Sequence, residues 1–330
     1  VLGAEPGEIY FTSGGTESDN WAIKGTGKRH IVSTAIEHYA VLKPLETLKR
    51  QGIDITLLDV DETGIVRPEQ LTDALRDDTG LVSVMFANNE TGTVQPVKEI
   101  GRICQERKIP FHSDAVQALG QIPFNLKELP VDLLSLSGHK IHAAKGIGIL
   151  YIRRGTLINP LLDGGAQERG RRAGTENTAA VAGLAVAVEE AVNGIEERSE
   201  YLHKIRERFL DGVLQIKGTH LNGDKNRRLP GNANVRFNGI EGESLVLMLD
   251  KHGICCSTGS ACTSGSMDAS RVLLAMGLSM EQARSSLRFT FSEENTEDEI
   301  DFIVKTLEQS VRKLRSTLTI AGCCCPDGCC

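Results

Sequence analysis

Short apolar runs alternate with amphipathic segments through roughly the first 190 residues of the chain. The apolar runs are rich in β-branched residues, as buried strands are, and the segments between them repeat apolar residues every three to four positions, as helices do. The predicted strands are EIYF, HIVSTAI, DITLLDV, LVSVMFA, IPFHSD, VDLLSLS and GILYIRR. Strands that alternate with helices predict an α/β fold with a mainly parallel, seven-stranded sheet.

The pattern changes after Thr178, where a long helical segment begins and continues beyond Asn193-Gly194. The region that follows predicts a smaller α+β domain with a long amphipathic last helix from Thr296 to about Arg315. Its predicted elements are the strands NVRFNGI and SLRFTFS, the helices ESLVLMLDKHG and SRVLLAMG, and the small-residue loop STGSACTSGS. We therefore expect a large domain over 1–195, a small C-terminal domain over 196–320 and a short tail over 321–330.

Composition and charge exclude several classes of protein. Hydrophobic residues make up 40% of the chain and charged residues 25%, which is ordinary globular usage. The 37 basic and 44 acidic residues leave a net charge of −7, which argues against a nucleic-acid partner. No apolar run approaches the roughly 18 residues of a membrane span, and the first residues lack the pattern of a secretory signal. We expect neither a nucleic-acid nor a membrane partner.

The cysteines are unevenly distributed. Five of the nine lie in the last eight residues, and the other four are too sparse for a disulfide framework, which favours a reducing, cytoplasmic compartment. Cys104, Cys255 and Cys256 follow or belong to apolar patterns, so we expect them to be buried. The Cys-rich tail, 321–330, is compatible with persulfide relay, with binding of a soft metal or with no catalytic role.

The first candidate for chemistry is TSGGTE, residues 12–17, between the strand EIYF and a helix. Small residues let backbone amides approach an anion, and a helix N-terminus supplies unpaired N–H groups. This pattern predicts a phosphate-binding turn. The alternative is a plain strand-to-helix turn in which Thr16 is the N-cap.

Two further candidates end predicted strands. Lys140 follows VDLLSLS, where desolvation favours the neutral amine that forms a Schiff base, although a lysine at a strand end can also reach solvent. Asp114 ends IPFHSD, where it could pair with a pyridinium nitrogen or cap the next helix. Carboxyl ends of parallel strands share one sheet edge. A phosphate-binding turn, an Asp and a Lys at that edge together predict a pyridoxal phosphate site.

Cys262 is the fourth candidate. It lies within STGSACTSGS, residues 257–266, where small and polar residues cannot pack a core and predict an exposed loop. A thiol in such a loop is accessible to substrates. The alternative is a tolerated surface cysteine, but exposed free thiols are a chemical liability, which favours a functional role.

Six motifs, TSGGTESDN, NNETG, HSDAVQ, SLSGHK, GGAQERGRRAGTEN and GSACTSGS, occur in an order and spacing that resemble the NifS/IscS group of cysteine desulfurases. This group belongs to the class V aminotransferase superfamily, and the resemblance extends from Val1 to about Arg315. It implies the fold type I architecture of pyridoxal 5'-phosphate enzymes. The chain departs from the usual group pattern at HKIHAAKG, MDASRVL and TFSEEN.

The resemblance also implies a role for each matching residue. The catalytic residues it implies are Lys140 as the Schiff-base lysine, Cys262 as the sulfur acceptor and His38 as an acid or base that stacks on the ring. The residues it implies for cofactor binding are Gly15, Thr16, Asn89, Asp114, Gln117, Ser137, His139 and Thr175, of which Thr175 would reach the phosphate of the partner subunit. Asn89 and Arg288 would bind substrate, and the guanidinium of Arg288 suits a carboxylate.

The implied reaction converts L-cysteine to L-alanine and leaves a persulfide on Cys262, in a homodimer that supplies sulfur for iron-sulfur cluster assembly. An iron-sulfur scaffold or another acceptor would take the sulfur, and Cys262 is a candidate transient iron-sulfur ligand shared with that scaffold. Two alternatives stay open at this point. One is a lyase acting on selenocysteine or cysteine sulfinate, and the other is a non-catalytic scaffold that binds metal or partner proteins.

Overall fold

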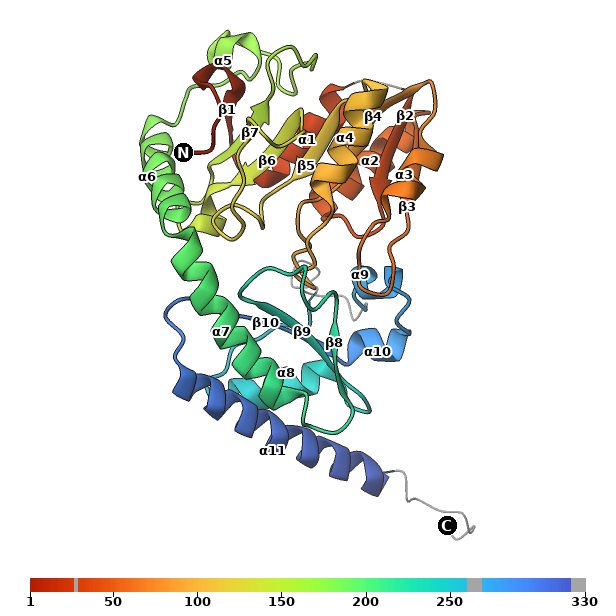
Figure 1. Ribbon diagram of the computed structural model, residues 1–330, viewed down its shortest axis with the longest axis vertical. Helices are drawn as coiled ribbons and strands as arrows, with labels where there is room; N and C mark the ends of the chain where they lie inside the picture. The colour runs from red at the N-terminus through yellow and green to blue at the C-terminus, as the bar shows by residue number, and fades with distance from the viewer. Residues whose placement is uncertain (27–28, 260–268, 322–330) are drawn as a thin grey trace. The chain divides into compact units, whose positions relative to one another are not determined.

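The computed structural model describes residues 1–26, 29–259 and 269–321, with side chains up to residue 317. They form two compact units (Figure 1). The large unit comprises 1–89, 93–199 and 226–229, and the small unit comprises 90–92, 200–225 and the chain from 230 onward. Sequence analysis places the boundary at residue 195 and does not anticipate the two short exchanges. Cys262 and residues 322–330 of the Cys-rich tail lie outside the described residues.

The large unit is built on a seven-stranded sheet with the order β1-β7-β6-β5-β4-β2-β3. Strands β2 to β6 pair in parallel with their neighbours, whereas β7 is antiparallel to both β6 and β1. The bounds are β1 (Ile9–Thr12), β2 (His30–Thr34), β3 (Asp54–Leu58), β4 (Thr79–Ser83), β5 (Phe111–Asp114), β6 (Leu133–Ser137) and β7 (Gly148–Ile152). The predicted mainly parallel, seven-stranded sheet is confirmed.

Helices cover both faces of this sheet, and the central strands are therefore buried along their whole length. One face packs around Trp21 and Val41 of α1 and α2, and the other around Ile100 and Leu184 of α4 and α6. The helices are η1 (Pro6–Glu8), α1 (Gly15–Gly25), α2 (Tyr39–Arg50), α3 (Pro68–Ala74), α4 (Val97–Arg107), η2 (Gly138–Ile141), α5 (Gln167–Gly170) and α6 (Thr178–Asn193).

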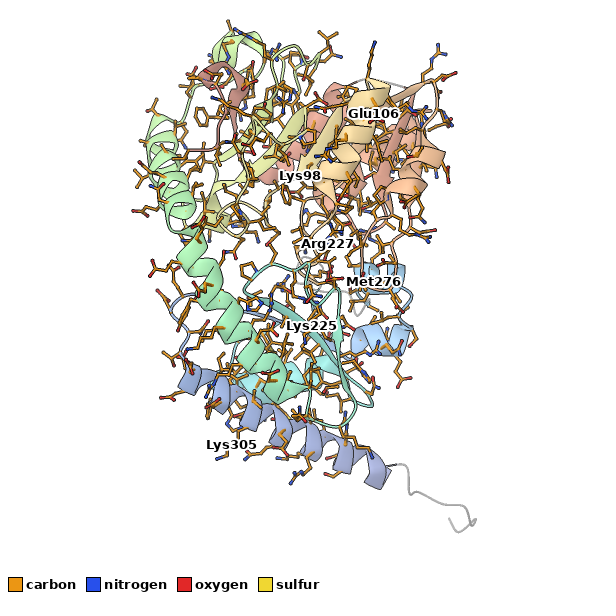
Figure 2. All side chains as sticks on the ribbon, viewed as in Figure 1. Lys98, Glu106, Lys225, Arg227, Met276 and Lys305 are labelled. Carbon is orange, nitrogen blue, oxygen red and sulfur yellow. The ribbon has the colours of Figure 1, made fainter. Side chains whose placement is uncertain are left out.

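Helix α4 illustrates the amphipathic pattern. Its buried side includes Ile100 and Cys104, whereas Lys98 and Glu106 are exposed (Figure 2). The expected burial of Cys104 is confirmed. Burial also raises the pKa of its thiol to about 12, so this cysteine is not a nucleophile at neutral pH.

The strand predicted over LVSVMFA differs from the structure. β4 begins earlier, at Thr79, and ends at Ser83. The next residues stay buried and still bond to β5, because the N–H of Val84 donates to the carbonyl of His112 at 3.1 Å and that of Phe86 to the carbonyl of Asp114 at 2.8 Å. An apolar run marks buried extended chain, but it does not mark where a regular ladder stops.

The small unit is an α+β structure, as predicted. Three antiparallel strands in the order β10-β9-β8 pack with helices around Phe209, Phe237 and Phe289. The elements are α7 (Ile195–Val213, which begins in the large unit), β8 (Thr219–Asn222), β9 (Asn232–Phe237), α8 (Gly242–Asp250), α9 (Arg271–Ala275), α10 (Met280–Arg284), β10 (Ser286–Thr290) and α11 (Glu297–Ala321).

Three details of the small unit differ from the sequence prediction. The short strand β8 and the short helix α10 were not predicted, because four or five residues are too few to display a period. Cys255 is exposed and Cys256 half-buried, so the prediction that both are buried is wrong for Cys255. The chain leaves α8 through a turn at residues 251–253, and Cys255 follows that turn.

No single helix among the described residues is both long and apolar enough to cross a membrane. Helices α6 and α7 reach that length and composition only when they are counted together, and they bend by 66° at their break.

Candidate active site

Helix α1 begins where two segments approach each other closely. Its N-cap is Gly14, with φ +152° and ψ 179°, and a Cβ added at Gly148 of β7 would lie 2.6 Å from the Cα of Gly14. A Cβ added at Gly15 would lie 2.8 Å from Val116 and 3.4 Å from the Cβ of Ser137. The absence of side chains therefore brings the first turn of α1 beside Ser137 at the end of β6.

This arrangement shows which residue of TSGGTE caps α1. Thr16 lies inside the first turn and is not the N-cap, so the alternative that makes it the cap is wrong. No side chain caps α1, and the first N–H groups of a helix have no partner within the helix. The turn therefore has the geometry of an anion cradle, with the buried hydroxyl of Ser137 next to it.

Asp114 ends β5 and is only 6% exposed. Its Oδ1 accepts the N–H of Val116 at 2.9 Å, so it does form the local turn contact that the capping alternative requires. Burial raises the pKa of Asp114 to about 6, while the Val116 N–H and the charge of Lys140 oppose that rise. At neutral pH this carboxylate is ionised but weakly solvated, and it favours a nearby cation.

Lys140 lies on η2, directly after β6, and is exposed in the described chain. Burial is the largest cause that lowers the pKa of His38 and of His139, and the charge of Lys140 is the second. The same charge also acts to lower the pKa of Asp114. One amine therefore acts electrostatically on three groups from three separate segments. Of the predicted residues, Lys140, Asp114, His38 and His139 are brought into one cluster.

His38 is the N-cap of α2, and its Nδ1 accepts the N–H of Ala40 at 3.1 Å. Burial, and then the charge of Lys140, lower its pKa, so the ring is neutral at pH 7. The hydrogen bond assigns the neutral ring a proton on Nε2. His38 is thus prepared to donate a proton from Nε2, and it must release Ala40 before Nδ1 can accept one.

A buried polar row lies behind Asp114, and sequence analysis did not single it out. His112, two residues earlier on β5, bonds through Nδ1 to Ser83 of β4 at 2.8 Å and through Nε2 to Ser135 of β6 at 2.9 Å. Burial lowers the pKa of His112 to about 3. The alternation of a strand puts His112 and Asp114 on one face, which is the signal that could have identified it.

Asp19 of α1 completes that row. Its Oδ1 lies 3.5 Å from Nε2 of His112 and has no hydrogen-bond partner among the described residues. Burial, and then the charge of Asp114, raise the pKa of Asp19 well above its usual range, although the hydroxyl of Ser135 opposes the rise. Burial and a neighbouring negative charge both favour the protonated form of Asp19, whereas Asp114 carries its charge at neutral pH.

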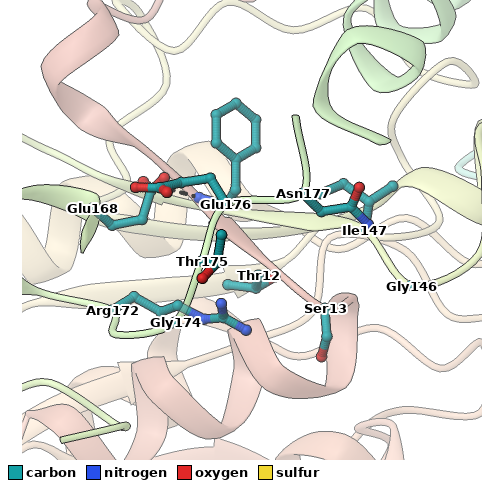
Figure 3. Close-up of a pocket in the computed structure, with 11 residues that line it drawn as sticks. Thr12, Ser13, Gly146, Ile147, Glu168, Arg172, Gly174, Thr175, Glu176 and Asn177 are labelled. Carbon is teal, nitrogen blue, oxygen red and sulfur yellow. Dashed lines mark hydrogen bonds between the residues drawn. The ribbon is translucent and has the colours of Figure 1, made fainter. Parts of the chain in front are cut away.

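Thr175 lines a cavity of about 200 Å³ (Figure 3). Across the cavity lie Thr12 and Ser13, which lead into the cradle, and Arg172, whose guanidinium pairs with Glu17 at 2.8 and 3.1 Å. Glu17 also accepts the N–H of Ser13 at 2.8 Å. In this single chain the predicted partner-reaching segment therefore lies against its own chain at the start of α1.

Asn89 and Gln117 are half-buried. Asn89 is the last residue of the large unit before the chain passes into the small one, and Gln117 follows Asp114 by one turn. Their neighbour Asn88 is fully buried and donates to the carbonyl of Ile36 at 3.0 Å, which fixes the backbone before Asn89.

Arg288 belongs to the small unit, on β10. It is half-buried, and its backbone forms a bridge with Ser257, with N–H to carbonyl distances of 3.2 and 2.6 Å. Glu90, which sequence analysis did not single out, has its pKa raised by burial and lowered in part by the charges of Arg288 and Arg271. Cys262 lies outside the described residues.

The large-unit residues fit pyridoxal phosphate in three independent ways. The cradle at Gly14 and Gly15 has no side chain that would fill it, and it offers N–H groups to a phosphate. Asp114 is a buried anion suited to a protonated ring nitrogen, and Lys140 offers an amine nearby. Among the described residues, no group of three or more His, Cys, Asp or Glu side chains is arranged to hold a metal ion.

Comparisons with known proteins agree with this geometry. Residues 1–303 match the family described as aminotransferase class-V. A protein of Methanosarcina thermophila named cysteine desulfurase IscS is 53% identical over 322 residues, which are 96% of this chain and 80% of that protein. A protein of the same name from Clostridium botulinum is 49% identical over 324 residues, which are 96% of this chain and 82% of that protein.

Solved structures show the same similarity. A NifS-like protein superposes with a TM-score of 0.88 at 39% identity and covers 95% of this chain and 85% of its own. A second structure, described as SspA in complex with cysteine, has a TM-score of 0.78 at 35% identity and covers 89% of this chain and 84% of its own.

Proposed function

The chain belongs to the class V aminotransferase family of pyridoxal phosphate enzymes, and we propose that it is a cysteine desulfurase. The reaction converts L-cysteine to L-alanine and leaves a persulfide on Cys262. The observation that carries the proposal is the cluster of Lys140, Asp114 and His38 beside the anion cradle of α1. Relatives named for this activity match 96% of the chain.

The large unit supplies the cofactor site. Gly15, Thr16, Ser137 and His139 would hold the phosphate, Asn89 and Gln117 would lie near the ring, and Lys140 would bond to the aldehyde carbon. When bound, pyridoxal phosphate accepts the electrons released at the α-carbon of an amino acid. Asp114 serves this chemistry by keeping a negative charge in a buried place, where it holds the ring nitrogen protonated.

His38 and Lys140 would move protons. The amine of Lys140, when it is neutral and free of the cofactor, would take the α-proton of the substrate. His38 keeps its proton on Nε2 while Nδ1 accepts Ala40 N–H, so it is arranged as a donor in its resting state. To assist ionisation of the Cys262 thiol as a base it must break this cap.

Arg288 would bind the substrate carboxylate, and Cys262 would attack the substrate sulfur. Cys262 must be a thiolate for this step, and an unperturbed cysteine is only a few per cent ionised at pH 7. The acceptor that then takes the sulfur would be an iron-sulfur scaffold, with Cys262 as a transient ligand. The cytoplasmic location that the cysteine distribution suggests stays a prediction.

A homodimer is the second part of the proposal. Helix α6 presents an apolar surface that the described chain leaves uncovered, including Val186, which is 56% exposed. Leu157 and Leu162, on the segment before α5, are 87% and 43% exposed. A second copy of the chain would cover this surface and receive Thr175 at its phosphate site. Molar mass in solution, with Val186→Asp as the disrupting variant, tests it.

The deciding experiment measures alanine and sulfide from L-cysteine with cofactor-loaded protein and an added thiol, which supplies the two electrons that release the persulfide sulfur as sulfide. We expect both products from wild type and from Cys255→Ser, which removes an exposed thiol outside the segment 260–268, and neither product from Cys262→Ser. Activity retained in Cys262→Ser on selenocysteine or cysteine sulfinate would instead identify a lyase. Protein that binds no cofactor and releases no product would identify a non-catalytic scaffold.

A further inference from the structure

The described residues on either side of segment 260–268 approach the same side chain, Glu90. Ser270, the second described residue after the segment, donates its hydroxyl to Oε2 of Glu90 at 2.5 Å. Gly259, the last described residue before it, lies against the same oxygen, because a Cβ added there would be 3.1 Å from Oε2. Glu90 is 180 residues away from Ser270 in sequence, so this convergence is produced by the fold of the small unit.

Each end is also tied to regular structure. On the first side, the N–H of Gly259 donates to the hydroxyl of Ser257 at 3.2 Å, and Ser257 forms the backbone bridge with Arg288 of β10. On the second side, Ser270 is the N-cap of α9, where its hydroxyl accepts the N–H of Leu273 at 3.2 Å. Ser270 is only 2% exposed. The Glu90 carboxylate lies at both attachments, because it accepts the Ser270 hydroxyl and lies close to Gly259.

Glu90 is itself held in place. Asn234 of β9 donates its side-chain amide to the carbonyl of Glu90 at 3.1 Å. The charges of Arg288 and Arg271, which flank the two ends, favour the ionised carboxylate and oppose the effect of burial. An ionised acceptor makes the stronger hydrogen bond to Ser270.

We propose that Glu90 is a positioning residue that fixes the distance between residues 259 and 270. These residues border the segment that contains Cys262, so their distance sets where that segment is attached. Only the meaning of this anchor for catalysis rests on the proposed function, because it takes Cys262 as the sulfur acceptor. The anchor itself is a property of the small unit.

Amide hydrogen exchange tests the anchor. Glu90→Ala and Ser270→Ala should each raise the exchange rates of residues 254–259 and 270–275 about tenfold or more, since each removes a hydrogen bond to a charged group. Ser270→Thr should restore protection by keeping the hydroxyl. Glu90→Gln, which keeps an acceptor of the same shape, should give a smaller increase. Ser279→Ala, which removes the N-cap of the similar short helix α10, is the matched control and should leave both ends unchanged.

Ser270→Ala also removes the N-cap of α9, so the double variant Glu90→Ala with Ser270→Ala should exchange no faster than Ser270→Ala alone, because the bond between the two side chains is lost in both. In steady-state kinetics Glu90→Ala should lower kcat for alanine formation about tenfold with cofactor absorbance unchanged. Exchange in Glu90→Ala that matches Ser279→Ala at both ends overturns the proposal. If both ends open but wild type forms no alanine, the anchor stands and the proposed function fails.

Discussion

Asp114 and Glu90 are both partly desolvated carboxylates, but the molecule holds them in different ways. Asp114 ends a strand that is buried along its length, and its direct partner is the N–H of Val116, two residues away. Glu90 belongs to a connection and is held by Ser270 and Asn234, which are 180 and 144 residues away. The first position follows from local pattern, whereas the second exists only once the small unit has folded.

Their charges are also balanced differently. Burial raises the pKa of both, and within the described part of the chain the Val116 N–H and one cation, Lys140, act against it for Asp114. For Glu90 two arginines, Arg288 and Arg271, and a hydroxyl act against it. The large unit therefore keeps an under-compensated anion, which suits a cationic ring, and the small unit keeps a compensated one, which suits a structural role.

Removing Lys140 gives the largest expected effect. Lys140→Ala should lower turnover of L-cysteine about 10³-fold, which lies within the range for loss of a group that moves a proton. Because its charge lowers the pKa of His38, that pKa should rise in the cofactor-free variant. Turnover and NMR titration of His38 check both statements.

The matched control is Lys145→Ala, because Lys145 acts on His139 but is not among the groups that shift His38. A His38 titration that is identical in Lys140→Ala and wild type would contradict the clustering of these side chains.

Asp114→Asn should separate function from stability. The pKa of Asp114 is about 6 when folded and about 4 when unfolded, so the folded chain loses stability as pH rises through this window. Without cofactor, the variant should be about 2–3 kcal/mol more stable than wild type at pH 8 and equal to it at pH 4. Cofactor affinity should fall at the same time. Urea unfolding at the two pH values measures the difference, and a variant less stable than wild type at pH 8 contradicts the prediction.

The features that the sequence predicts are those that depend on local patterns, as the position of Asp114 does. The sheet, the cradle at Gly15 and the strand-end residues Asp114 and Lys140 were predictable, because strand and helix periods and small-residue turns are local signals. The role of Arg288 came only from resemblance to a family, since an arginine on a three-stranded sheet has no local sign of function.

What the sequence did not reveal depends on distant contacts. The hydrogen bonds of His112 with Ser83 and Ser135 form because three strands are neighbours in the sheet. The sequence of a single strand does not predict which strands will be its neighbours. The position of Glu90 could not be predicted either, because its partner Ser270 is 180 residues away in sequence. Cys255 was wrongly expected to be buried because an apolar run before it does not reveal the turn that exposes it.

Arg288→Lys sharpens the comparison from the side of the small unit. Lysine keeps the positive charge that acts on Glu90 but loses the two-pronged geometry for a carboxylate. The KM for L-cysteine should rise about tenfold with little change in kcat. Hydrogen exchange of residues 270–275 should stay as in wild type, and faster exchange there would mean that Arg288 also maintains the anchor.

Asp19→Asn gives the smallest expected effect, and it tests which carboxyl holds the charge. Burial, and then the charge of Asp114, raise the pKa of Asp19 well above its usual range, which favours the neutral carboxyl. An amide of the same shape should therefore change the free energy of unfolding by less than about 0.5 kcal/mol, as substitutions that remove no interaction do. Asp19→Ala should lower it by about 1–3 kcal/mol, because it removes a buried polar contact. If Asp19 were ionised, removing its charge would lower the pKa of Asp114 and shift the loss of stability with pH to lower values. Unfolding followed from pH 4 to pH 8 distinguishes the two, since an unshifted profile in Asp19→Asn leaves Asp114 as the group that carries the buried charge.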